Sequence, residues 1–384
     1  MIAVIADDLT GAAEIGGLGL CYGLTTEIVC NNDLTSDADL LIIATDTRSM
    51  AKKQALKATV LLTAKLAEIK PAMVFKKVDS VLRGHVIGEL AIHLQHLHLK
   101  RALLVPANPA LGRTIKNGRY FINDHPIHLT SFACDPEFPI TSPEVHNMLK
   151  VDKNIVHICK NDELLQEYGI TVGECTTDRE IIKWIKRSDE ETLLAGGSAF
   201  FKALLESLNL YRRSGQDRGT ELAHPALFVC GSMFGKSQEI VAKISNNGGP
   251  VSYMPIDIVT LPEPSEMLFD AWADEIISLL KIHGKAIVAI HHDISASVAI
   301  TASRLRDKKA VVIKKVFERV LIKELLMEGG STAAAIINRL NFSRLFPVNQ
   351  LGPGIIKLKT YARDDLFLTL KPGSYDWPAG IWNF

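Results

Sequence analysis

The chain has 384 residues, with 43 Lys and Arg against 43 Asp and Glu, so its formal net charge is zero at pH 7. This length predicts two domains, and the balanced charge gives no electrostatic reason to expect a nucleic acid or an anionic membrane as a partner. Although 47% of the residues are hydrophobic, no apolar run is long enough to cross a membrane. Six cysteines stand singly, without a C-x-x-C pair, and Met1 leads directly into an apolar run. We therefore expect reduced thiols, no signal peptide and a cytoplasmic location.

Apolar runs alternate with helical patterns through the first half of the chain. Strands are predicted at 2–6, 26–30, 40–45, 73–78 and 102–106, and helices at 11–22, 51–69 and 86–99. This alternation predicts an α/β fold with a mostly parallel sheet flanked by helices. Residues 107–143 are rich in proline and predict a long irregular segment, which in a compact domain usually serves function.

A polar, charged stretch at 211–221 is the best candidate for a linker between domains. A second α/β pattern follows it, with strands predicted at 226–230, 250–255, 285–290 and 323–327, and helices at 235–246, 264–283, 296–306, 309–320 and 332–340. We therefore predict an N-terminal domain over 1–210, a linker over 211–225 and a C-terminal domain over 226–384. Each domain is expected to have a mostly parallel sheet flanked by helices.

Two acids follow the first predicted strand. Asp7 and Asp8 come directly after residues 2–6, and Thr10 stands two positions further on. A helix cap, worth about 1 kcal/mol, would explain one of these polar residues but not both acids. Arg48 follows the strand at 40–45, and its planar guanidinium suits a carboxylate. Ligands collect beyond the carboxyl ends of parallel strands, so we expect these side chains to line a site.

A third polar cluster follows the strand at 73–78. It supplies cations, an acid and a hydroxyl: Lys77, Asp79, Ser80 and Arg83. A solvated charged face would also explain them, as a surface loop would explain Arg113 in the proline-rich segment. Polar side chains follow three predicted strands and would lie at the same edge of the sheet. This arrangement favours a site that recognises carboxylates and hydroxyls. In the next helix, His93 and His96 lack the H-E-x-x-H spacing, so we predict surface positions rather than metal ligands.

Two predicted strands of the second half end in glycine turns that open helices. The segment 231–237 is similar to a P-loop but has three residues, not four, between its first glycine and Gly-Lys-Ser. The other turns supply glycines and hydroxyls: Gly329, Gly330, Ser331, Thr332 and Gly354. Free N–H groups and the helix dipole at such helix starts suit an anion. Together these turns predict a site for nucleotide phosphates.

In their order and spacing, these motifs resemble those of the four-carbon acid sugar kinases. The resemblance extends over nearly the whole chain. In the first half it is carried by Ala6-Asp-Asp-Leu-Thr-Gly-Ala12, Asp46-Thr-Arg-Ser49, Lys77-Val-Asp-Ser-Val-Leu-Arg-Gly84, Gly112-Arg-Thr114 and Thr130-Ser-Phe-Ala-Cys-Asp-Pro136. In the second half it is carried by Gly231-Ser232, Gly329-Gly330, Gly352-Pro-Gly354 and Lys371-Pro-Gly-Ser374.

The resemblance implies a kinase that uses ATP and Mg²⁺ to phosphorylate the terminal hydroxyl of threonate, erythronate or a 3-oxo-tetronate. The N-terminal domain would bind the sugar acid and the C-terminal domain would bind ATP. Substrate contacts would fall on Asp8, Thr10, Arg48, Lys77, Asp79, Ser80 and Arg83, with Arg113 completing the pocket. Nucleotide contacts would fall on Ser232, Gly329, Gly330, Ser331, Thr332 and Gly354. The ligands of the metal stay unassigned.

The mechanism is a hypothesis at this point. Arg48, with Arg83 or Lys77, would clamp the substrate carboxylate, and an acid would orient or deprotonate the attacking hydroxyl. The candidates for that acid, in order of preference, are Asp8, Asp79 and Asp7. Asp8 ranks first because an acid at a strand end can point into the crevice.

A departure from the family pattern in the second half of the chain supports an alternative function. The family usually has an acid after the second glycine, where this chain has Ser331. A sensor of sugar acids or nucleotides that has lost turnover is therefore the second hypothesis. An ATP-dependent ligase that works through an acyl phosphate is the third, since a split acid pocket and a phosphate site also suit that chemistry. The stereoisomer of the substrate and the oligomeric state, a homo-oligomer included, stay open.

Overall fold

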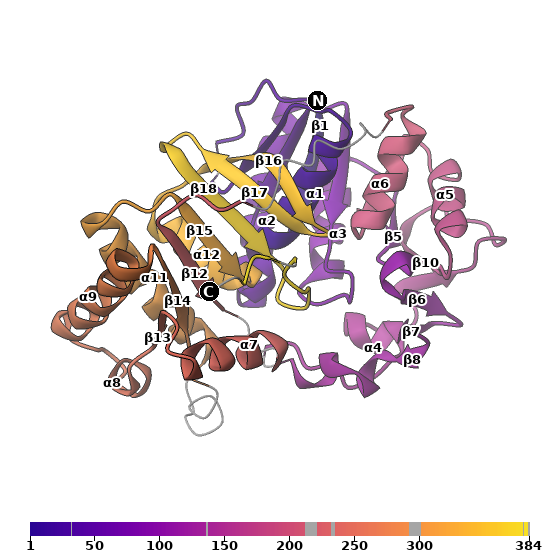
Figure 1. Cartoon of the computed structure of the whole chain (residues 1–384). Coiled ribbons are helices and arrows are strands. Elements are labelled where there is room, and N and C mark those ends of the chain that lie inside the picture. The colour runs from indigo at the N-terminus through magenta and orange to yellow at the C-terminus, as the bar shows by residue number, and fades with distance from the viewer. Residues whose placement is uncertain are drawn as a thin grey trace. The chain divides into compact units, whose positions relative to one another are not determined.

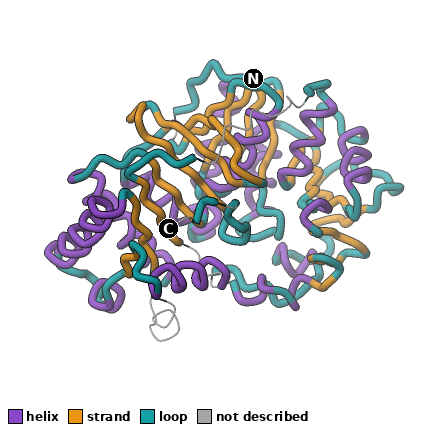
Figure 2. The backbone as a smooth tube through the Cα atoms, in the orientation of Figure 1, coloured by secondary structure: helices purple, strands orange, loops and turns teal. Residues whose placement is uncertain are grey.

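The computed structural model describes residues 1–31, 33–135, 137–211, 221–231, 235–291, 301–378 and 380–382, with the backbone alone for 235 and 236. It divides into two units, Met1–Ser214 and Gly215–Phe384. Each unit combines helices with a largely parallel sheet (Figures 1 and 2), which confirms the predicted α/β class. Within the described ranges, no helix is both long and apolar enough to span a membrane.

The main sheet of the first unit is parallel, in the strand order β2-β3-β1-β4-β11-β5-β10-β9. Its strands are β1 (Ile2–Ala6), β2 (Thr26–Val29), β3 (Leu40–Ala44), β4 (Met73–Lys77), β5 (Arg101–Val105), β9 (Val156–Cys159), β10 (Gly169–Gly173) and β11 (Thr192–Gly196). The helices are α1 (Leu9–Cys21), α2 (Lys52–Ile69), α3 (Val86–Leu97), α4 (Val145–Leu149), α5 (Asp178–Lys186) and α6 (Ser198–Ser207).

The elements from α4 to α6 have no counterpart among the predicted ones. One signal for them was present, because Thr177 and Glu180 form a capping box at the start of α5.

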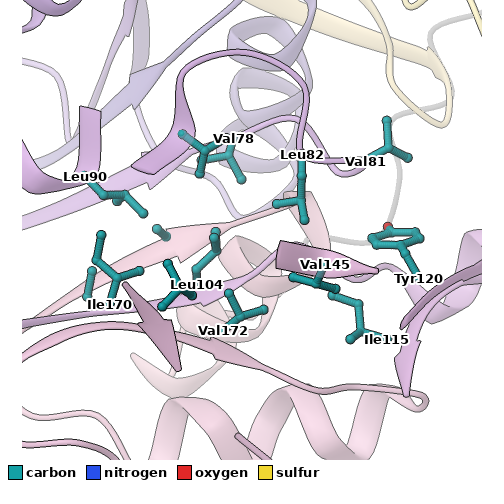
Figure 3. Packing of buried hydrophobic residues seen from close by; sticks show 14 of the residues in the cluster. Val78, Val81, Leu82, Leu90, Leu104, Ile115, Tyr120, Val145, Ile170 and Val172 are labelled. Atoms are coloured by element: carbon teal, nitrogen blue, oxygen red, sulfur yellow. The ribbon is translucent and has the colours of Figure 1, made fainter. Parts of the chain in front are cut away.

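The proline-rich segment is more regular than predicted. It contains a small antiparallel sheet of β6 (Arg113–Lys116), β7 (Arg119–Ile122) and β8 (His125–Pro126). This sheet joins the core of the first unit, because Ile115 and Tyr120 lie in one cluster with Leu104 of β5 and Val172 of β10 (Figure 3). The Tyr120 hydroxyl donates to the carbonyl oxygen of Ser80 at 2.6 Å, so this core also holds the segment that follows β4.

The sheet of the second unit has the order β13-β14-β12-β15-β18-β17-β16. The strands from β13 to β18 in this order are parallel, and β17 and β16 continue the sheet in antiparallel fashion. The strands are β12 (Ala226–Cys230), β13 (Val251–Tyr253), β14 (Lys285–Ala289), β15 (Glu324–Glu328), β16 (Arg344–Gly352), β17 (Ile355–Thr360) and β18 (Arg363–Lys371). The helices are α7 (Gly235–Asn246), α8 (Ile256–Thr260), α9 (Glu266–His283), α11 (Ala302–Arg319) and α12 (Gly330–Arg339). Figure 1 shows α9 and α11 side by side. The antiparallel strands were not predicted.

The predicted break between helices at 296–306 and 309–320 is wrong. Over the described residues, both predictions fall on the single helix α11. Lys308 lies at the supposed break, and it is buried within α11. Its ammonium donates to three carbonyl oxygens at the end of α8. These contacts satisfy the buried charge within a continuous helix, so no break in the helix is needed to expose Lys308 to solvent.

Candidate functional site

The predicted acids and cations of the first unit follow three neighbouring strands. β1 lies between β3 and β4, with Ala6 beside Ala44 on one side and Lys77 on the other. Because the three strands run parallel, their carboxyl ends reach the same edge of the sheet. The structure therefore brings together the residues that follow them: Asp7, Asp8, Arg48, Asp79 and Arg83.

The Arg48 guanidinium is the centre of this cluster. Its Nε and Nη2 donate to the two carboxylate oxygens of Asp7 at 2.9 and 2.8 Å, and Nη2 also donates to Oδ1 of Asp8 at 2.8 Å. Its Nη1 lies 3.8 Å from Oδ1 of Asp79. The planar fork that we predicted for a substrate carboxylate is therefore occupied by acids of the protein itself. A direct contact between Arg48 and a substrate stays a prediction.

Asp8 has two functions in the local structure. It is the N-cap of α1, with Oδ1 accepting from the Gly11 N–H at 3.0 Å. Its Oδ2 accepts from the Thr10 hydroxyl at 2.7 Å, and the described residues offer this oxygen no other donor. Capping thus explains Asp8 in part, as the sequence suggested. It does not explain Asp7, which Arg48 holds.

Arg83 binds a second pair of acids. Its Nε and Nη2 donate to the two oxygens of Asp79 at 2.7 and 2.9 Å, and its backbone N–H donates to the same carboxylate at 3.1 Å. Its Nη1 donates to Asp135 at 2.7 Å. Asp135 was not among the predicted site residues, although it lies in a segment that carried the family resemblance.

The other predicted substrate residues border this cluster. The Lys77 ammonium donates to the carbonyl oxygen of Val78 at 3.0 Å and lies 3.7 Å from the Glu14 carboxylate. Arg113 donates to the Ser80 hydroxyl. All the predicted substrate residues of the first unit thus lie at or beside one edge of the sheet.

The environments of the three candidate acids differ. Burial raises the pKa of Asp7, although the charge of Arg48 opposes the rise. Burial also acts to raise the pKa of Asp8, but Arg48 and Lys77 outweigh it and the net pKa is lowered. For Asp79, burial is outweighed by Arg83 and Arg48, which hold the pKa well below its usual range. Asp8 and Asp79 are therefore carboxylates at neutral pH.

The predicted surface position of His93 is wrong. His93 is fully buried, and its Nδ1 shares a hydrogen bond of 2.8 Å with the Thr63 hydroxyl of α2. Burial lowers its pKa well below the ordinary value. On the same face of α3, Glu89 forms a buried ion pair with Lys76. The helix α2 packs against this face of α3. The polar side chains of α3 that predicted exposure to solvent therefore contact other residues inside the protein. His96 is half-buried.

In the second unit, the turns that follow β12 and β15 pack directly against each other. A Cβ atom on Gly231 would lie 2.2 Å from Oγ1 of Thr332 and 2.4 Å from the carbonyl oxygen of Glu328. Gly329 has a φ of 92°, a conformation that favours glycine, and Gly330 is the first residue of α12. Two of the predicted phosphate-binding turns are therefore neighbours in space.

Replacing Gly231 with alanine is expected to lower the free energy of unfolding by about 1–3 kcal/mol, the usual effect of overpacking. The new methyl group would overlap a backbone oxygen, which cannot rotate away. Thermal unfolding measures the change. Gly352→Ala is the matched control, since its Cβ would meet no atom closer than 3.4 Å. Equal losses in the two variants would show that the contact between the turns is not tight.

The remaining predicted nucleotide residues have separate positions. Gly354 lies in the turn between β16 and β17, with a φ of 68°, and a Cβ there would lie 2.4 Å from the Tyr375 ring. Ser331 is the second residue of α12. Ser232 lies outside the described residues. Tyr375 also connects Gly354 to β18, because its carbonyl oxygen accepts from the Lys371 ammonium at 2.5 Å.

Sequence reasoning missed several polar residues around these turns. Glu328 ends β15, and its Oε2 accepts from the Ser237 hydroxyl at 2.9 Å and from Trp377 Nε1 at 3.1 Å. The Lys371 ammonium lies 3.5 Å from the same oxygen. Lys309 of α11 donates to the carbonyl oxygen of Cys230 at 2.8 Å. Glu328 and Lys371 could have been found from the sequence, because each is a charged residue at the end of a largely apolar strand.

Comparisons with known proteins extend these observations. A family model described as a sugar-binding N-terminal domain matches residues 2–204. The chain is 26% identical to a D-threonate kinase of Salmonella typhimurium, over 97% of this chain and 94% of that protein. It is 22% identical to a 3-oxo-tetronate kinase of Haemophilus influenzae, over 98% and 97%. A solved protein of Salmonella typhimurium LT2 shares the fold with a TM-score of 0.76 at 18% identity, covering 98% of this chain and 96% of that one.

Proposed function

The chain belongs to the family with a sugar-binding N-terminal domain, and on this basis we propose that it is an ATP-dependent kinase for the terminal hydroxyl of a four-carbon sugar acid. The similarity to kinases of threonate and 3-oxo-tetronate along nearly the whole chain carries the proposal. In it, residues 1–210 bind the sugar acid and residues 226–384 bind ATP together with Mg²⁺. The Mg²⁺ neutralises charge on the transferred phosphate.

The acid cluster supports the choice of substrate. A Cβ on Gly11 would lie 2.6 Å from Oδ1 of Asp8 and 3.2 Å from Nζ of Lys77. Glycine at position 11 therefore lets a carboxylate and an ammonium both approach the start of α1 closely. An acid and a cation at one place suit a molecule that carries both a hydroxyl and a carboxylate. Lys77 would attract the carboxylate, with Ser80 and Arg113 as further polar contacts.

Asp8 is the best candidate for the acid that orients the attacking hydroxyl. Its Oδ2 already accepts a hydrogen bond from a hydroxyl, that of Thr10. Asp79 suits this role less, because Arg83 binds both of its oxygens and its pKa lies well below the usual range. Arg48 would then act as a positioning residue that fixes Asp8 and Asp7.

The test is ADP release from ATP with a panel of threonates, erythronates and 3-oxo-tetronates, with the product identified by mass spectrometry. We expect ADP and a stable phosphorylated sugar acid from at least one compound. The matched 4-deoxy acid, which lacks the terminal hydroxyl, should give no product. Tight binding without ADP would favour the sensor, and ADP only in the presence of an added amine or thiol would favour the ligase.

A further inference from the structure

Glu328 is a buried acid with one oxygen that has no hydrogen-bond partner in the described part of the chain. The residue is 1% exposed. Its Oε2 has the donors Ser237 and Trp377, whereas its Oε1 is buried and has no hydrogen-bond partner among the described residues. A buried carboxylate oxygen without a partner is unfavourable. This oxygen therefore points to a ligand.

Lys309 is a second buried charge with few partners. It is 2% exposed, and the Cys230 carbonyl is its one acceptor within the described ranges, although an ammonium can donate three hydrogen bonds. Cys230 and Glu328 are register partners at the carboxyl ends of β12 and β15. Lys309 thus reaches the strand end that carries Glu328.

Three other buried charges of this unit have a full set of partners among the described residues. Lys308 donates to three carbonyl oxygens, and Lys371 donates to three carbonyl oxygens of the C-terminal segment. Glu324, at the opposite end of β15, accepts hydrogen bonds on both carboxylate oxygens. A purely structural function accounts for these three residues. It does not explain why Glu328 Oε1 and two hydrogen-bonding positions of Lys309 lack partners in the ranges that the structure describes.

We propose that Glu328 and Lys309 form the phosphate end of the nucleotide site, where Glu328 Oε1 binds the Mg²⁺ and Lys309 Nζ donates to a phosphate oxygen. This assignment rests on the proposed kinase function. Mg²⁺ in nucleotide sites is bound by one or two carboxylates together with the phosphates, and an ammonium forms strong hydrogen bonds with phosphate. Glu328 also lies next to the start of α12, a helix of 10 residues, whose free N–H groups and dipole favour an anion.

The test measures ADP affinity by calorimetry with and without Mg²⁺, so that no turnover is needed. For Glu328→Gln, we expect the gain in affinity that Mg²⁺ provides to fall by about tenfold or more, while metal-free ADP binds as in the wild type. For Lys309→Met, we expect ADP to bind about tenfold more weakly with or without Mg²⁺, while adenosine binding is unchanged. Glu324→Gln is the matched control, a buried acid of the same strand, and should keep the full Mg²⁺ gain.

A wild-type Mg²⁺ gain in Glu328→Gln would overturn the metal assignment, and unchanged ADP affinity in Lys309→Met would overturn the phosphate assignment. Should Glu328→Gln not fold, Glu328→Asp keeps the charge on a side chain shorter by one methylene group. An undiminished Mg²⁺ gain in that variant would also count against the assignment. Failure of the wild-type protein to bind ADP would instead overturn the proposed function itself, and the assignment with it.

Discussion

Replacing Asp8 with asparagine is expected to lower kcat by about 10²–10⁴-fold, the usual contribution of a positioned acid or base. Asparagine keeps a side-chain oxygen that can cap α1, but it removes the negative charge that would orient the attacking hydroxyl. The affinity for ADP should not change. Steady-state kinetics with the best sugar acid, together with ADP calorimetry, measure the two effects separately.

Two further variants test whether the loss of kcat is specific to the charge of Asp8. Asp7→Asn changes the adjacent buried acid, which Arg48 binds through both oxygens, and we expect a smaller loss of kcat. Asp8→Ala should add a loss of stability of about 1 kcal/mol, because the cap on α1 also disappears. A normal kcat in Asp8→Asn would remove Asp8 from the mechanism, and a larger loss in Asp7→Asn would transfer the role to Asp7.

Replacing Arg48 with alanine is expected to lower the free energy of unfolding by about 3–5 kcal/mol at neutral pH, as in other proteins where one partner of a buried ion pair is removed. The carboxylates of Asp7 and Asp8 would remain buried, and Arg48 is the cation that binds both of them. Chemical denaturation followed by circular dichroism measures the loss.

The loss of stability in Arg48→Ala should depend on pH. In the wild type, the lowered pKa of Asp8 contributes stability above the ordinary value of 3.8, and this contribution disappears as the pH falls through the lowered pKa. The raised pKa of Asp7 acts in the opposite direction and subtracts stability at neutral pH. In Arg48→Ala, the buried side chains of Asp7 and Asp8 lower the free energy of unfolding only when they are ionised. The difference from the wild type should therefore shrink as the pH falls towards about 4.

Arg119→Ala is the control for this measurement. Arg119 also pairs with an acid, Glu144 at 3.1 Å, but both side chains are about half exposed, at 46% and 49%. Solvent screens such a pair, so the variant should unfold almost as the wild type does. A loss in Arg48→Ala no larger than that in Arg119→Ala, or one independent of pH, would contradict the buried cluster.

Local patterns predicted a large part of this molecule. The strands β1, β3 and β4 and the helices α1 to α3 lie close to their predicted positions, because apolar runs and helical periodicity are properties of short segments. The polar strand ends were found for the same reason. Short strands such as β9 and the C-terminal strands β16 to β18 were missed, since their stability comes from the strands beside them.

The sequence by itself determined the α/β class, the family resemblance and the residues that stand at the strand ends. Only the tertiary structure decided which partners these residues have. Arg48 and Asp7 are 41 positions apart, and Arg83 and Asp135 are 52 apart, so these pairs depend on the order of strands in the sheet and on long-range packing. That Glu328 Oε1 lacks a partner among the described residues likewise follows only from the positions of donors on other elements. Periodicity is a local property of a chain, whereas the satisfaction of a buried charge depends on the whole fold.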